Sequence, residues 1–155
     1  MELKELKKNY GVLAKKYKLP SFAELDGAFE IYKIDRESDT LLRDVRKHTM
    51  EKVVNSLGFV EMLLSGMNAP RMYYSYLKTM SPEDRKKLEN VYSQFAELIV
   101  FSLELEVKYD EKSEAELIKK IFKVWDSVRG DFSFVLKNIR KPAANSVKKE
   151  RSYFG

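Results

Sequence analysis

Two side chains in the first half of the chain have the chemistry of metal-independent phosphoester cleavage. His48 is the single histidine, and Arg43 precedes it by five residues. An imidazole with a pKa near neutrality moves the proton of a ribose hydroxyl, and a guanidinium holds the scissile phosphate. The pair therefore defines one candidate catalytic site, and its chemistry requires no metal ion.

The spacing of these two residues matches a known ribonuclease motif. The Arg-x4-His arrangement over residues 43–48 resembles that of HEPN ribonucleases, small all-α proteins that work as dimers. The resemblance implies an RNA-cleaving enzyme that uses Arg43 and His48. The alternative interpretation is a histidine on a helix surface without a catalytic role.

The composition excludes several other kinds of site. The chain has no cysteine, so thiolate zinc sites, iron–sulfur clusters, thiol nucleophiles and disulfides are absent. One histidine excludes multi-histidine metal sites and the paired Glu-x-x-His motifs of di-iron bundles. No glycine-rich phosphate-binding loop is present. We therefore predict no cofactor and no metal site.

The positive charge is concentrated at the two ends of the chain. The net charge is +5, while residues 1–20 hold six lysines against two glutamates. Residues 137–155 hold six cations against one glutamate, so the interior is acidic. Basic ends of this kind predict an acidic partner, either nucleic acid or protein.

The candidate binding residues are the cations of both ends and a basic face of the last predicted helix. Phe134 lies among the lysines of that face, where a single aromatic ring would stack on a base. Together with the C-terminal cations, these residues are expected to form a continuous basic surface. The set is Lys4, Lys7, Lys8, Lys15, Lys119, Lys123, Phe134, Lys137, Arg140, Lys141, Lys148, Lys149 and Arg151. Tyr153 and Phe154 follow as a candidate docking motif for a groove on another protein.

Apolar residues recur at intervals of three and four along most of the chain, which is the period of an amphipathic helix. The clearest series begins at Leu42 and ends at Met67. These series predict three long helices, over about 39–66, 82–108 and 114–140, and shorter helices over 2–18, 22–33 and 70–79. No run of residues is apolar and long enough to span a bilayer.

Local signals set the predicted boundaries. Ser21 with Glu24, and Ser113 with Glu116, have the spacing of capping boxes at helix starts. Pro142 is expected to end the last helix, because the residue before a proline avoids helical angles. The sequence therefore predicts a bundle over 1–142.

Two segments are ambiguous. Residues 103–109 alternate between apolar and polar, as in a strand, but a lone strand has no pairing partner, so we favour a helix. Glu106 would then point into the apolar stripe, and we expect the helix to fray by this residue. In the segment 70–79, Met72 and Tyr76 share the apolar stripe and are expected in the core, whereas Tyr74 projects away.

The sequence thus predicts a cytoplasmic, single-domain all-α bundle with a basic, mobile tail over 143–155. The leading functional hypothesis is a non-enzymatic helical adaptor of a protein or nucleoprotein assembly, with its basic ends on an acidic partner. The first alternative is the metal-independent ribonuclease that uses Arg43 and His48. A third hypothesis is a peripheral membrane protein, held on the membrane surface by residues 2–18.

Overall fold

The computed structural model describes residues 2–35, 37–66 and 69–153, with side chains described as far as Lys141. The protein is 85% helical, and the described part of the chain contains no strand. The predicted fold class, a single-domain all-α bundle with several long helices, is confirmed.

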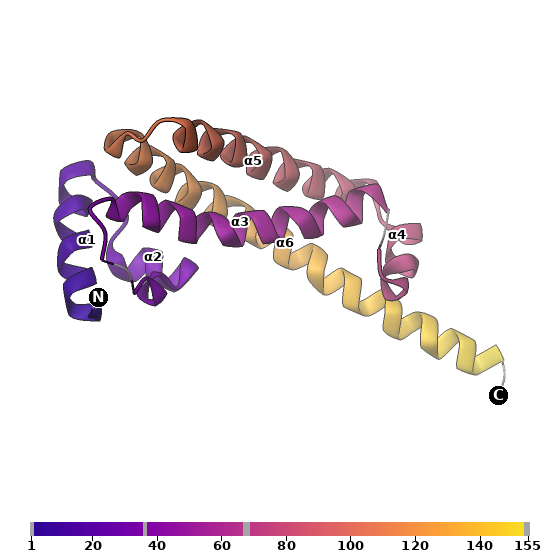
Figure 1. Ribbon diagram of the computed structural model, residues 1–155. Helices are drawn as coiled ribbons and strands as arrows, with labels where there is room; N and C mark the ends of the chain where they lie inside the picture. The colour runs from indigo at the N-terminus through magenta and orange to yellow at the C-terminus, as the bar shows by residue number, and fades with distance from the viewer. Residues whose placement is uncertain (1, 36, 67–68, 154–155) are drawn as a thin grey trace.

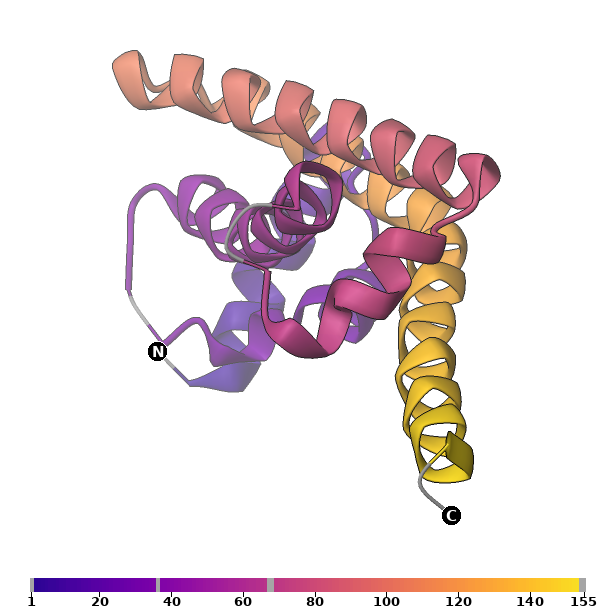
Figure 2. The same cartoon turned by 90° about the vertical axis from the view of Figure 1, so that its right-hand side faces the viewer.

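Three long helices form the body of the bundle, and short helices cover its two ends (Figure 1). α3, α5 and α6 pack against one another in pairs, while α1 and α2 lie at one end and α4 at the other. Figure 2 shows α4 beside the later turns of α6. The elements are α1 (Leu3–Tyr17), α2 (Phe22–Phe29), η1 (Ile31–Lys33), α3 (Leu41–Ser65), η2 (Arg71–Tyr73), α4 (Tyr74–Thr79), α5 (Pro82–Val107) and α6 (Glu111–Tyr153).

The start of α2 follows the predicted capping box. The amide of Glu24 donates to the Ser21 hydroxyl at 3.2 Å, and the amide of Ser21 donates to the Glu24 carboxylate at 2.8 Å. The helix ends before the predicted residue 33, because Glu30 adopts a left-handed conformation with φ of 54°. The carboxylate of Asp26 then accepts the amide of Tyr32 at 2.8 Å, which stabilises the turn into η1.

The start of α6 differs from the prediction. The amide and hydroxyl of Ser113 donate to the Asp110 carboxylate at 2.9 Å and 2.6 Å, and the helix begins at Glu111. The predicted capping box of Ser113 with Glu116 is therefore wrong. Aspartate is as good an N-cap as serine, and Asp110 comes three residues earlier.

The end of α6 differs as well. Its backbone continues past Pro142 to Tyr153, so the prediction that the helix ends at this proline is wrong. Proline has a φ close to the helical value, and within a helix it removes one backbone hydrogen bond. The division into a bundle over 1–142 and a mobile tail over 143–155 stays a prediction.

α5 resolves the ambiguous segment as a helix. It runs without interruption from Pro82 to Val107, and Lys108 is the first extended residue after it. Its start is capped by Ser81, whose hydroxyl accepts the amide of Asp84 at 3.0 Å.

The core lies between the apolar stripes of α3, α5 and α6. Burial of each large apolar side chain contributes about 1.5–3 kcal/mol, so these stripes hold the bundle together. Fully buried members include Leu42, Val53, Leu63, Leu88, Phe95, Leu98, Leu117, Ile118 and Ile121. No helix in the described part of the chain is both long and apolar enough to cross a membrane.

Candidate functional site

A buried ion pair joins α3 to the first turn of α6. The side chains of Arg46 and Glu114 are 2% and 0% exposed. The guanidinium donates to the two carboxylate oxygens at 2.8 Å and 3.0 Å. Two parallel bonds of this kind satisfy both charges away from water, whereas a buried charge without its partner is strongly destabilising. This pair therefore fixes how α6 begins against α3.

Glu106 extends the ion pair toward solvent. Its carboxylate accepts from Arg46 at 2.8 Å and from Arg43 at 3.1 Å. The hydrogen bond from Arg46 lowers the pKa of the Glu106 carboxyl, although partial burial acts in the opposite direction. The expectation that α5 frays by Glu106 is wrong, because two arginines of α3 hold the carboxylate while the helix continues.

The stabilising effect of Glu106 is expected to depend on pH. The pKa of Glu106 is lower in the folded state than in the unfolded state. Its contribution to the free energy of unfolding is therefore complete above the unfolded pKa of about 4.3. The contribution is lost as the pH falls through the lower pKa of the folded state. We expect the difference in free energy of unfolding between wild type and Glu106→Gln to shrink toward zero below about pH 4. Urea denaturation over a pH series measures it, and a constant difference would contradict the assignment.

The structure does not bring the two candidate catalytic residues together. Arg43 points to α5, where it binds Glu106 and lies over the Tyr109 ring at 5.9 Å. Nε2 of His48 lies 3.1 Å from the carbonyl oxygen of Phe29 at the end of α2. The two side chains thus contact different neighbours of α3 and share no cavity among those of the described residues.

The basic candidates lie in separate regions of the surface. Those of α1 are exposed at one end of the molecule, and those near the end of the described side chains of α6 are exposed at the other (Figure 1). Lys119 forms an ion pair with Glu116 at 3.3 Å, while Lys123 is exposed. Lys119 and Lys137 are about 27 Å apart along α6 at 1.5 Å per residue. The basic candidates of α1 and of α6 are therefore not adjacent, and the continuous basic surface of α6 with the C-terminal cations stays a prediction.

The remaining candidates belong to the last eight residues of the chain. Lys148, Lys149, Arg151, Tyr153 and Phe154 lie outside the residues whose side chains the structure describes.

Phe134 has a neighbour that the sequence did not indicate. It is 48% exposed, and Nζ of Lys87 from α5 lies 4.2 Å from the centre of its ring. A lysine at this distance is attracted to the face of the ring. Phe134 is therefore packed within the protein on one face and is not a free stacking group.

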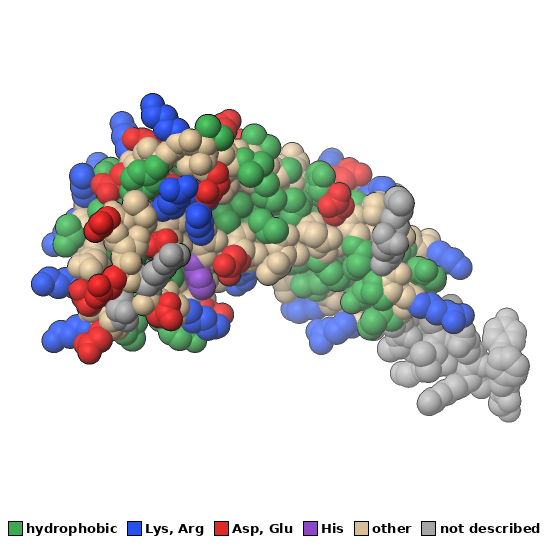
Figure 3. All heavy atoms as spheres, viewed as in Figure 1, with side chains coloured by type: hydrophobic (Ala, Val, Ile, Leu, Met, Phe, Trp, Pro, Cys, Tyr) green, Lys and Arg blue, Asp and Glu red, His purple; other side chains and the backbone are tan. Residues whose placement is uncertain are grey.

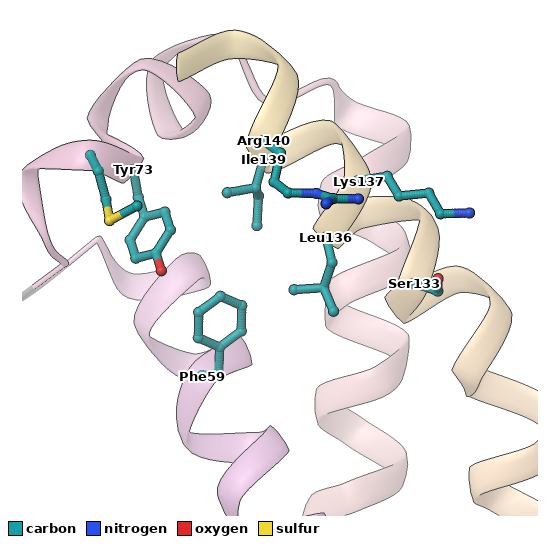
Figure 4. Close-up of a pocket in the computed structure, with 8 residues that line it drawn as sticks. Phe59, Tyr73, Ser133, Leu136, Lys137, Ile139 and Arg140 are labelled. Carbon is teal, nitrogen blue, oxygen red and sulfur yellow. The ribbon is translucent and has the colours of Figure 1, made fainter. Parts of the chain in front are cut away.

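An apolar groove lies between η2 and α6, with α3 at its floor (Figure 4). It encloses about 560 Å³, and its walls come from α3, η2 and α6. Phe59 and Tyr73 form one side, with ring centres 5.9 Å apart and their planes nearly perpendicular. Leu136 and Ile139 form the opposite side.

Two cations stand at the edge of this groove. Lys137 and Arg140 belong to α6 and are exposed, and the lysine side chain extends away from the two aromatic rings (Figure 4). Neither forms an ion pair with a residue of the described part of the chain. The groove thus combines an apolar floor with positive charge that has no internal acidic partner there.

The surface around the groove is apolar with basic margins. Figure 3 shows hydrophobic side chains gathered over α4, with lysine and arginine side chains on both sides of them. Met72, expected in the core, is 65% exposed and lines the groove. Tyr76 is buried and Tyr74 is 49% exposed, as expected.

Most groove residues were missed by the sequence analysis. Lys137 and Arg140 were candidates, but the apolar walls were assigned to the core or left unassigned. Leu136 lies beside the apolar stripe of α6 and is 37% exposed, so its position outside the stripe could have indicated an apolar surface there. The opposite wall comes from η2, whose place beside α6 depends on the tertiary fold.

Comparison of the chain with protein-family models, with curated proteins and with solved structures finds no match in any of the three. The described residues contain no group of three or more histidine, cysteine, aspartate or glutamate side chains placed to hold a metal ion. The groove between η2 and α6, which joins apolar walls to two exposed cations, is therefore taken as the candidate site.

Proposed function

We propose that the protein is a non-enzymatic helical adaptor that binds an acidic segment of a partner protein in the groove between η2 and α6. The observation that carries this proposal is the combination of an apolar groove with Lys137 and Arg140 at its edge. A partner with apolar side chains and adjacent carboxylates complements both features, because the apolar contacts give affinity and the charges give orientation.

The same geometry favours a protein over a nucleic acid. A phosphate backbone is recognised by a row of cations, and single-stranded bases stack on free aromatic faces. Here the cations of α1 lie at the opposite end of the molecule, and Phe134 already contacts Lys87. Tyr73 is packed edge-on against Phe59. The groove therefore supplies apolar surface where a nucleic acid requires stacking platforms.

The two other hypotheses have less support. Arg43 and His48 contact separate neighbours, as described above. The apolar stripe of α1 buries Leu6 and Tyr10 inside the bundle, which leaves less apolar surface for a membrane. No contact of the described residues specifically favours the ribonuclease or the membrane-surface hypothesis.

Reversing the charge at the groove edge is expected to abolish capture of the partner. The tagged protein is purified from its native cell, with and without nuclease, as wild type and as Lys137→Glu/Arg140→Glu. We expect wild type to retain its partner after nuclease treatment and the variant to lose it, because the carboxylates of the partner would then face two glutamates.

The matched control carries the same change in charge elsewhere. Lys86→Glu/Lys112→Glu alters two exposed lysines of α5 and α6 that do not line the groove. This control is expected to capture the partner as wild type does. Loss of all partners after nuclease, or equal capture by both double variants, would contradict the proposal.

A further inference from the structure

A second cavity continues the groove along α6. It encloses about 670 Å³ and lies between α2, α3 and α6. Ser133 of α6 borders both cavities, so the two meet at this residue. Trp125 and Phe122 supply apolar surface in the second cavity, as Phe59 and Leu136 do in the first.

Six of the ten residues that α6 contributes to the two cavities lie on one stripe of the helix. They follow one another at steps of three and four residues, which is the spacing of a single helical stripe. From first to last they cover about 27 Å, at 1.5 Å per residue. The stripe consists of Phe122, Asp126, Arg129, Ser133, Leu136 and Arg140.

The middle of this stripe is open. Gly130 and Ser133 face the cavity from α6, and Gly27 and Ala28 face it from α2. A Cβ atom added to Gly27 or Gly130 would meet no atom within 4 Å. Small side chains on the walls allow the axis of another helix to approach closely, within the usual 8–10 Å of packed helices.

The charges along the stripe are uneven. In the second cavity, Asp126 forms an ion pair with Arg129 at 3.2 Å, and Glu24 accepts the amide of Ser21. The ammonium group of Lys52 there donates to the carbonyl oxygen of Ala28 at 2.6 Å and lies over the Trp125 ring, so it is engaged within the protein. At the other end, Lys137 and Arg140 form no ion pair with the described residues. A bound segment would therefore place its carboxylates over this end.

We propose that the two cavities form one trough that receives a single amphipathic helix of the partner protein, which lies along α6 and packs over Gly130. The inference rests on the proposed function and adds the conformation, length and orientation of the bound segment. The helix has about 18 residues, to match the length of the trough. Its apolar stripe faces the aromatic floor, and its acidic residues lie near Lys137 and Arg140. This is the helix-in-groove mode of recognition.

A helix fits the trough better than an acyl chain does. The second cavity is bordered by Glu24, Lys52, Asp126 and Arg129, whose charged groups suit the polar flanks of a helix. A hydrocarbon chain would bury these groups without compensation, at a cost in free energy.

The test is a selection of helical peptides on the full-length protein. A phage library of random peptides of about 18 residues, matched to the trough length, is selected on wild type, and the enriched peptides are synthesised. Their affinities are measured for wild type, for Gly130→Leu and for Gly11→Leu. Both glycines are helical with open space at Cβ, but Gly11 belongs to α1, away from the trough.

We expect the enriched peptides to have apolar residues at steps of three and four, with aspartate and glutamate on one side. We expect Gly130→Leu to weaken their binding about tenfold or more, the scale of a change at the centre of an interface. Gly11→Leu should leave the affinity unchanged. Circular dichroism checks that both variants fold, and leucine is a better helix former than glycine. No enrichment, peptides without helical period, or equal affinity for all three proteins would overturn the inference.

Capture from the native cell separates this inference from the proposed function. If Lys137→Glu/Arg140→Glu loses the partner while Gly130→Leu keeps it, the adaptor function stands and the helix in the trough does not. If the double variant keeps the partner, the proposed function itself is wrong.

Discussion

Replacing Glu114 with leucine is expected to lower the free energy of unfolding by about 3–5 kcal/mol, the usual effect of breaking a buried ion pair. Arg46 would remain 2% exposed with Glu106 as its one acidic partner, and both bonds to Glu114 would be lost. The loss therefore comes from the charge left behind and not from the leucine. Urea denaturation followed by circular dichroism measures the change.

The double variant Arg46→Met/Glu114→Leu is the matched comparison. It carries the same leucine but removes the buried charge as well. Replacement of a buried pair by apolar residues of similar size is often neutral or stabilising by about 1–4 kcal/mol. We therefore expect the double variant to recover most of the lost stability. A single variant as stable as wild type would show that the Arg46–Glu114 pair is not buried in solution.

Replacing Trp125 with alanine is expected to lower the free energy of unfolding by about 3–5 kcal/mol, the range for large aromatic residues in cores. The indole stacks on Phe95 with ring centres 6.0 Å apart and planes 9° apart. It also contacts Phe29 of α2 at 5.9 Å, and Nζ of Lys52 lies 4.5 Å from its ring. One side chain thus joins α6 to α2, α3 and α5.

Phe134→Ala is the control for this prediction. Phe134 belongs to the same helix but is 48% exposed, and its described ring contact is with Lys87. We expect Phe134→Ala to lower the free energy of unfolding by less than about 1 kcal/mol, the scale of an exposed cation–π contact. Equal losses in the two variants would mean that α6 is rotated relative to the other helices.

The long helices were predictable because their evidence is local. The series of apolar residues that begins at Leu42 lies within one element, and α3 follows it within two residues at either end. The stop at Gly66 was predictable for the same reason, and its φ of 67° is the left-handed conformation that glycine adopts easily. The apolar period and the residues that end helices predict these elements without any knowledge of the tertiary structure.

The boundaries that failed depend on competition between neighbouring signals. Asp110 and Ser113 are both good N-caps, and spacing alone does not rank them. Glu30 takes a left-handed conformation that is uncommon for a residue with a side chain. The hydrogen bond from the amide of Tyr32 to the carboxylate of Asp26 stabilises that turn. The spacing of apolar residues does not indicate such a bond.

The site was harder to predict because its parts come from distant segments. Arg46 and Glu114 are 68 positions apart, and neither stands out among the many charged residues of the chain. Phe134 was interpreted as a free ring because Lys87 approaches from a different helix. Lys137 and Arg140 were predicted from charge alone, whereas the apolar wall opposite them exists only when η2 lies beside α6.

The position of Trp125 gives the protein an intrinsic optical reporter. It is the single tryptophan of the chain, and its indole borders the second cavity. The emission wavelength of an indole follows the polarity of its surroundings. A helix seated over Gly130 would exclude water from this edge of the ring and move the emission to shorter wavelength. An occupant held by the lysines of α1 would leave the spectrum unchanged, so an unlabelled titration can distinguish the two.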